Sequence, residues 1–183
     1  RLLVSRALGM PLAVYYDLRD DGDDPAEKEH NFGLLARDYS EKPAFRAVRA
    51  SLAQVKGRRF AGFLPLEPST LHALRLDGED DVGIALWTEA MGQTIAVRVP
   101  APASAVDQYG EALPVADGQV QLSESAGPVF LTFPRPPAAD AALPGPDAAP
   151  DAGMPPDADA LDAAAAPAGP DAQTVTLPDV GRP

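Results

Sequence analysis

Six side chains near the start of the 183-residue chain have the types expected in a binding site. They are Tyr15, Tyr16, Asp17, Glu29, His30 and Asn31. Tyrosine rings can stack against a ligand. Carboxylate, imidazole and amide groups can orient substrate hydroxyls or donate hydrogen bonds to a catalytic carboxylate. We therefore select these residues as candidates for substrate binding.

Each group of candidates also has a structural explanation. Successive side chains of a strand point to opposite faces, so one of Tyr15 and Tyr16 would pack under a helix and the other would fill an interior. His30 and Asn31 would satisfy backbone groups of their own loop before Phe32 anchors it. Both explanations stay open for the tyrosines, and the structural one is favoured for the loop residues.

The acidic loop after Asp17 does not fit a calcium-binding loop. Placing Gly22 at the sixth position puts Asp17 first and Asp21 fifth, but Arg19 then falls third and Lys28 twelfth, where carboxylates are required. A looser cation site stays an alternative, but the loop is interpreted as a solvated acidic surface, and we expect neither a metal nor a cofactor.

Helix, buried strand, loop and helix are predicted in this order, which is the pattern of an α/β protein. Residues 1–8 carry apolar side chains at helical spacing and end at Gly9, where a left-handed C-cap is expected. Residues 11–16 are continuously apolar, which is typical of a strand covered on both faces. Residues 41–56 form the clearest predicted helix, which ends at Gly57. The apolar face of that helix consists of Phe45, Val48, Leu52 and Val55.

The pattern changes after Gly57, where we place a domain boundary. Six short apolar or alternating runs follow, separated by breaks rich in turn residues, which indicates a small antiparallel β-sandwich at residues 58–133. The runs are residues 59–64, 71–76, 82–87, 94–99, 119–122 and 129–133. The residues predicted to be buried are Phe63, Ile84, Leu86, Trp87, Val97 and Phe130. His72 has no candidate partner nearby in the sequence and is interpreted as structural.

Residues 134–183 are predicted to be a disordered linker. Most of them are Pro, Ala, Asp or Gly, so the segment buries too little apolar surface to offset the entropy of ordering it. Its last ten residues, TVTLPDVGRP, are interpreted as the start of a further module or anchor.

Composition excludes several classes of partner. The formal net charge of −12 argues against binding to nucleic acid or to an anionic membrane surface. The absence of cysteine excludes disulfides and zinc–thiolate sites. No apolar run approaches the roughly 20 residues needed to span a bilayer.

Four motifs in the first 55 residues resemble the C-terminal end of retaining (β/α)8-barrel glycoside hydrolases, similar to family 39 and family 5 type enzymes. They are YYD at residues 15–17, DDG at 20–22, EHNFGL at 29–34 and KPAF at 42–45. In such barrels the last strand usually presents a tryptophan beneath the reacting sugar, and Tyr15 stands in its place.

The resemblance implies that residues 1–57 are the last αβα piece of a TIM barrel, followed by the antiparallel β-sandwich and the disordered tail. It also implies hydrolysis with retention through two carboxylates, a nucleophile and a general acid/base. In this clan those carboxylates lie at the ends of the fourth and seventh strands, so both would precede Arg1 and no catalytic residue is assigned. The six candidates would bind a polysaccharide or oligosaccharide substrate. A lone parallel strand needs neighbours on both edges, so residues 1–56 are not expected to close into a domain.

The repeated Pro-Asp-Ala of the tail resembles linkers in secreted and cell-surface proteins of some high-GC bacteria, which predicts that location. A competing hypothesis is a non-catalytic carbohydrate-binding or surface-interaction module. Trp87 is the only tryptophan and lies in a predicted strand, where a core role is more common than an exposed sugar platform.

Overall fold

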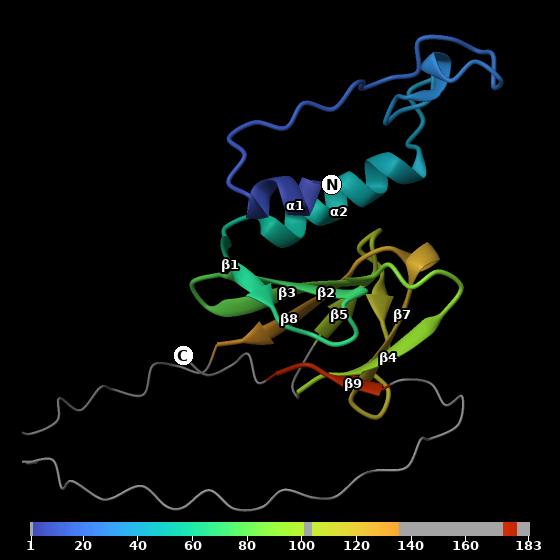
Figure 1. Cartoon of the computed structure of the whole chain (residues 1–183). Helices are drawn as coiled ribbons and strands as arrows, with labels where there is room; N and C mark the ends of the chain where they lie inside the picture. Colours follow the sequence, from blue (N-terminus) through green and yellow to red (C-terminus); the bar gives the residue numbers. More distant parts are fainter. Residues whose placement is uncertain (1, 101–103, 136–173, 179–183) are drawn as a thin grey trace, which may run out of the picture. The chain divides into compact units, whose positions relative to one another are not determined.

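The computed structural model describes residues 2–100, 104–135 and 174–178 (Figure 1). Helix α1 spans Leu2–Ala7. It ends at Gly9, which has a positive φ of 69°. The Gly9 amide donates to the Arg6 carbonyl at 3.1 Å and the Met10 amide to the Ser5 carbonyl at 3.0 Å. These two bonds form a Schellman C-cap, so the predicted helix end at Gly9 is confirmed.

Helix α2 spans Pro43–Val55, with proline in its first turn, and Gly57 follows with a φ of 74°. The predicted helix is confirmed, but its predicted buried face is only partly right. Val55 is buried, whereas Leu52 is 50% exposed. Ala50, which the sequence analysis left out, is buried in its place. None of the helices in the described part of the chain is long and apolar enough to cross a membrane.

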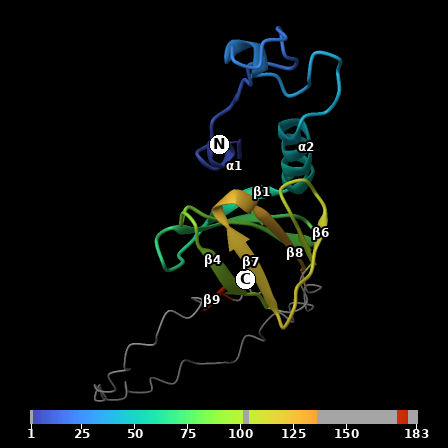
Figure 2. The same ribbon diagram turned by 90° about the vertical axis from the view of Figure 1, so that its right-hand side faces the viewer.

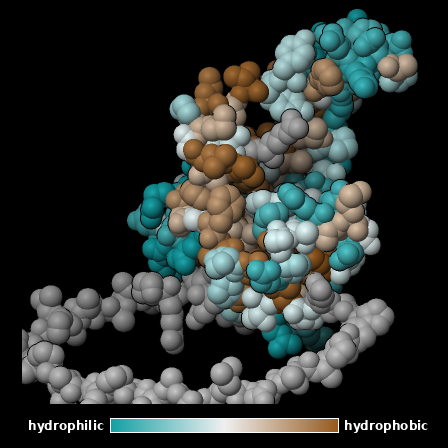
Figure 3. Space-filling view, in the orientation of Figure 1, coloured by the Kyte–Doolittle hydropathy of each residue, from teal (hydrophilic) through white to brown (hydrophobic). Residues whose placement is uncertain are grey.

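The predicted buried strand at residues 11–16 is wrong. This segment is irregular, with Leu12 72% and Val14 82% exposed. A strand covered on both faces needs hydrogen-bonding neighbours on both edges, and residues 2–58 contain only isolated bridges. The αβα part of the predicted fold class therefore does not form here. Figure 3 shows apolar side chains on the surface of this part of the molecule.

Among the described residues, the β domain contains all six predicted strands and three further short ones. Its strands are β1 Arg59–Leu64, β2 Leu71–Asp77, β3 Asp81–Thr88, β4 Thr94–Arg98, β5 Ser104–Val106, β6 Ala112–Leu113, β7 Gln119–Ser123, β8 Val129–Pro134 and β9 Thr174–Thr176. One sheet has the order β1-β2-β3-β8-β5-β6 and the other the order β7-β4-β9. All pairings are antiparallel except that of β4 with β9.

A tight turn illustrates why the breaks in the sequence marked the strand ends. Asp117 and Gly118, just before β7, have φ values of 52° and 68°. The Gln119 amide closes the turn by donating to the Ala116 carbonyl at 2.8 Å. Two successive left-handed residues favour Asp-Gly, which is the pair found here.

A hydrophobic cluster lies on each face of the six-stranded sheet. Figure 2 shows the helices α1 and α2 on one side of this sheet. The larger cluster combines side chains from both sheets, such as Ile84 of β3 and Val97 of β4. The smaller one joins Phe130 of β8 to Val55 of α2, with Leu3 of α1 packed against it. The sheet is therefore apolar on both faces, and the helices α1 and α2 cover one of them.

The predicted core is correct for four of its six residues. Ile84, Leu86, Val97 and Phe130 are buried. Phe63 is 50% exposed because it lies on β1, the edge strand of its sheet, where burial alternates with exposure. Trp87 is half-buried, stacked on His72 and packed against the smaller cluster.

The predicted disordered linker needs correction at both of its ends. Pro134 belongs to β8, and residues 174–176 form β9. Leu177 is 2% exposed and lies in the larger cluster. The remainder of the predicted linker, residues 136–173 and 179–183, lies outside the described residues.

Arg58 connects the end of α2 to the β domain. Its guanidinium donates to the Gln54 carbonyl at 2.8 Å and to the two carboxylate oxygens of Asp81 at 2.8 and 2.6 Å. It also donates to the Thr132 hydroxyl of β8 at 3.2 Å. A Cβ at Gly83 would lie 2.9 Å from this guanidinium, so glycine leaves the space that the side chain occupies. The hydrogen bonds from Arg58 hold the pKa of the Asp81 carboxyl below its usual value.

Candidate functional site

The loop after Asp17 is folded by backbone pairing between its two ends. The Leu34 amide donates to the Asp17 carbonyl at 3.1 Å, and the Leu35 amide to the Leu18 carbonyl at 2.9 Å. The Asp20 amide returns a bond to the Leu35 carbonyl at 2.9 Å. These bonds place two short extended segments side by side in parallel, with Leu34 buried. The long loop therefore has a defined structure of its own.

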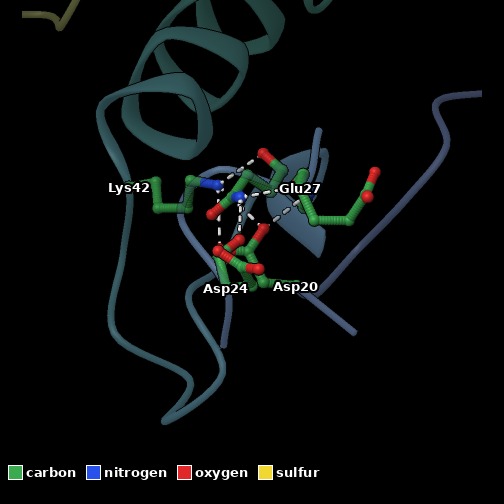
Figure 4. Close-up of polar contacts among 6 residues, drawn as sticks. Asp20, Asp24, Glu27 and Lys42 are labelled. Atoms are coloured by element: carbon green, nitrogen blue, oxygen red, sulfur yellow. Dashed lines mark hydrogen bonds and ion pairs between the residues drawn. The ribbon is translucent and has the colours of Figure 1, made fainter. Parts of the chain in front are cut away.

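An ion pair between Asp20 and Lys42 lies at the centre of this loop (Figure 4). The Lys42 ammonium contacts the two oxygens of Asp20 at 2.8 and 3.0 Å and the Asn31 carbonyl at 2.9 Å. The Gly33 amide donates to the same carboxylate at 2.8 Å. Asp20 is 8% exposed, and a carboxylate at that depth needs both a cation and hydrogen-bond donors. A Cβ at Gly33 would overlap the Asp20 backbone, so only glycine fits there.

The predicted group Glu29, His30 and Asn31 forms a single 3-10 turn, Glu29–Asn31. The Asp24 amide donates to Nδ1 of His30 at 3.3 Å. The Asn31 side-chain amide donates to the carbonyls of Glu27 at 2.7 Å and Asp24 at 3.0 Å. His30 and Asn31 thus make the backbone contacts of the structural explanation. The Glu29 side chain is exposed.

Tyr15 and Tyr16 lie in the irregular segment before the loop, 56% and 68% exposed. The next residue, Asp17, differs from both. Its Oδ1 atom is buried and has no hydrogen-bond partner among the described residues. A buried carboxylate oxygen without a donor is costly, on the order of 1–3 kcal/mol or more. Asp17 is therefore the candidate that has a buried oxygen for which the described residues supply no hydrogen-bond donor.

Of the six candidates, only Glu29, His30 and Asn31 lie together, in one 3-10 turn. Asp17 is hydrogen-bonded to Leu34 and Asn31 to Lys42, and neither of these partners is a candidate. No hydrogen bond or ion pair within residues 2–100 joins Tyr15 or Tyr16 to the turn at Glu29–Asn31. The sequence analysis missed Asp20 and Lys42. Both residues lie in motifs that carry the family resemblance, Asp20 in DDG and Lys42 in KPAF. No local pattern links them, because they are 22 positions apart in the chain.

The remaining polar side chains add no further residues to this site. The described residues contain no cluster of three or more His, Asp or Glu side chains that could hold a metal ion. A groove of about 420 Å³ lies beside Arg58 and includes none of the six candidates. His72 has a neighbour that the sequence analysis missed, because Nε2 lies 3.5 Å from an oxygen of Glu89. Its ring also stacks on Trp87 at a centroid distance of 5.2 Å.

Replacing Asp20 by Ala should open the loop without unfolding the β domain. The change leaves the Lys42 ammonium with one acceptor and the Gly33 amide with none. We expect amide exchange at Leu34 and Leu35 to become roughly tenfold faster or more, equivalent to about 1.4 kcal/mol, in hydrogen-exchange mass spectrometry. Asp23→Ala is the matched control, because it removes a 3.4 Å ion pair with Arg37 that is exposed on both sides. Equal exchange in the two variants would contradict a central role for Asp20.

Comparisons with known proteins show which proteins this chain is similar to. No protein-family description and no curated protein match the sequence. Among solved structures, the chain is similar to a family 39 glycoside hydrolase from the gut symbiont Bacteroides cellulosilyticus WH2, with 30% identity and a TM-score of 0.53. That similarity covers 63% of this chain and 24% of the other, so the chain corresponds to about a quarter of that enzyme's length.

A second solved structure is a GH30 endoxylanase from Clostridium papyrosolvens C71, with 9% identity, a TM-score of 0.44, and coverage of 56% of this chain and 30% of the other. Similarity at that level supports no conclusion by itself. The structural neighbours are thus glycoside hydrolases of families 39 and 30, and the chain is similar to part of a family 39 glycoside hydrolase.

Proposed function

We propose that this chain is the C-terminal portion of a retaining glycoside hydrolase of the family 39 type, which cleaves O-glycosidic bonds in a polysaccharide or oligosaccharide. The observation that carries the proposal is the 30% identity to a solved family 39 enzyme over 63% of the chain. The two catalytic carboxylates of such an enzyme lie outside residues 1–183, so the chain alone is expected to be inactive.

The exposed apolar segment of residues 11–16 supports this proposal. Its sequence is typical of a buried parallel strand, yet Leu12, Val14 and Tyr16 are each more than two-thirds exposed. A segment of this kind becomes stable when strands on both sides supply hydrogen bonds and apolar cover. In the proposed enzyme those strands belong to the rest of a (β/α)8 barrel, and residues 1–57 complete it.

In this arrangement the loop after Asp17 forms a wall of the substrate cleft. Barrel active sites are built from the carboxyl ends of strands and the loops that follow them. The proposed substrate-binding residues are Tyr15, Tyr16, Asp17, Glu29, His30 and Asn31. The Asp20–Lys42 pair fixes the loop that carries the last three, and Asp17 Oδ1 would find its missing donor in the completed barrel or the substrate. The proposed location is secreted or at the surface of a bacterial cell.

The experiment that tests the proposal compares this chain with the longer protein it requires. The longer protein should hydrolyse at least one member of a panel of β-glucans, xylans, exopolysaccharides and aryl glycosides, with retention detected by proton NMR of the first product anomer. Residues 1–183 alone should show no hydrolysis. A longer reading frame without two glutamates at the ends of predicted strands would instead favour the carbohydrate-binding alternative.

Replacing the tyrosine that stacks on the sugar should lower kcat/KM of the longer enzyme. Loss of an aromatic face from the transition state costs about 1–3 kcal/mol, equivalent to a five- to 150-fold decrease. We expect this decrease in one of Tyr15→Ala and Tyr16→Ala, because neighbouring residues of a strand face opposite sides. Tyr39→Ala is the control, since Tyr39 is 65% exposed in the same loop and contacts Arg19. Unchanged turnover in both test variants would make the end of the strand purely structural.

A further inference from the structure

The last described segment of the chain occupies an edge of the β domain. Strand β9 pairs in parallel with β4, so that Ala96, Val97 and Arg98 lie opposite Thr174, Val175 and Thr176. The Leu177 amide then donates to the Arg98 carbonyl at 2.9 Å. Figure 1 shows this strand, in red, alongside β4.

The side chains of this segment match the edge that they cover. Thr174 and Thr176 are exposed, Val175 is half-buried, and Leu177 is buried within the larger hydrophobic cluster. This alternation is that of a strand with one apolar face. Pro178 follows and has no amide hydrogen to continue the ladder. Without β9 the strand β4 would be an open edge, and the larger hydrophobic cluster would lose the side chain of Leu177.

We propose that the edge of β4 opposite β7 is a docking site for one extended segment, and that residues 174–177 of the same chain are its occupant. The β domain therefore does not end at β8. The Arg135 amide, directly after β8, donates to the Asp80 carbonyl at 2.8 Å, and Thr174 is the first residue of β9. Pro178, which follows Leu177, is exposed at the surface of the β domain. This inference is independent of the proposed catalytic activity.

A disulfide-trapping experiment on the full 183-residue chain tests the register. The chain has no cysteine, so any disulfide comes from the introduced pair. The test variant combines Arg98→Cys with Thr176→Cys, at two exposed positions that are directly paired. Paired strands lie about 4.8 Å apart, which is within the range of Cα–Cα distances found in disulfides. Diamide takes up the two protons and two electrons that the thiols lose. Thr94→Cys with Thr176→Cys is the control, because Thr94 lies four residues, or about 13 Å, further along β4.

We expect the test pair to form an intramolecular disulfide at least tenfold faster than the control, measured by loss of alkylation and a monomer mass lower by two hydrogens. Equal rates in the two pairs would overturn the proposed register. Covalent dimers formed faster than the intramolecular disulfide would show that a second copy supplies the strand, and would overturn the same-chain occupant.

A second measurement isolates the role of Leu177. We expect Leu177→Asp to speed amide exchange in residues 94–98 at least tenfold, whereas Thr176→Asp, which adds the same charge at an exposed position, should leave it within about twofold. Equal protection in the two variants would overturn the assignment of Leu177 as the anchor. The trapping experiment remains decisive if Leu177→Asp does not fold, since it leaves Leu177 in place.

Discussion

Replacing Leu131 by Ala should lower the free energy of unfolding by about 3 kcal/mol, within the range of 2–5 kcal/mol for deeply buried leucines. Leu131 is fully buried on β8, directly between Ile84 of β3 and Ala105 of β5. Its side chain belongs to the cluster shared by both sheets. Truncation therefore removes apolar contact and leaves a cavity that paired strands on both sides prevent from collapsing.

Urea unfolding measured by Trp87 fluorescence checks this value, since Trp87 is the only tryptophan and lies in β3. Leu52→Ala is the matched control. Leu52 is 50% exposed on α2, so the same chemical change should cost no more than about 0.5 kcal/mol. Similar losses in the two variants would show that the β domain is not the stable core of the chain.

Replacing Asp81 by Asn should destabilise the chain by about 2 kcal/mol at neutral pH, because a charged hydrogen-bond partner of Arg58 is lost. The Arg58 side chain is only 11% exposed, so water replaces the carboxylate poorly. Asp80→Asn is the control, because Asp80 is exposed and its side chain does not contact Arg58. Urea unfolding of both variants and the parent chain measures the difference.

The stabilisation by Asp81 should also depend on pH. The pKa of Asp81 is lowered in the folded chain, chiefly by its hydrogen bonds with Arg58. A carboxyl group with a lowered folded pKa stabilises the fold above its unfolded pKa of about 3.9, and that stabilisation disappears as the pH falls through the folded pKa. The difference between the parent chain and Asp81→Asn should therefore be constant from pH 7 to about pH 5 and shrink below about pH 4. A difference that does not change between pH 7 and pH 3 would contradict the ion pair.

Most of the β domain could be predicted because its signals are local. Alternating apolar residues and Asp-Gly or Gly-rich breaks predict β1, β2, β3, β4, β7 and β8 without reference to distant residues. The short strands β5 and β6 have only three and two residues, which is too few for a recognisable alternation. They form because β8 offers an edge to β5, and β5 offers one to β6.

The candidate site likewise combines features that local sequence predicts with contacts that only the folded chain reveals. The sequence identified the loop after Asp17 and the residue types within it, because loop length and polar composition can be read along the chain. It also favoured backbone contacts for His30 and Asn31, which the structure confirms. It could not identify the pairing of Asp20 with Lys42, because that pairing depends on the return of the chain at Leu34, which brings together residues far apart in the sequence.

The sequence by itself therefore determined the helix ends at Gly9 and Gly57, the main strands of the β domain and the loop that carries the candidate residues. Each of these follows from backbone preferences or side-chain periodicity within a few neighbouring residues. Only the tertiary structure decided that residues 11–16 remain unpaired and that residues 174–177 join the sheet. A strand is stable when another strand offers its edge, and β4 offers one to residues 174–176, whereas no strand within residues 2–58 offers one to residues 11–16.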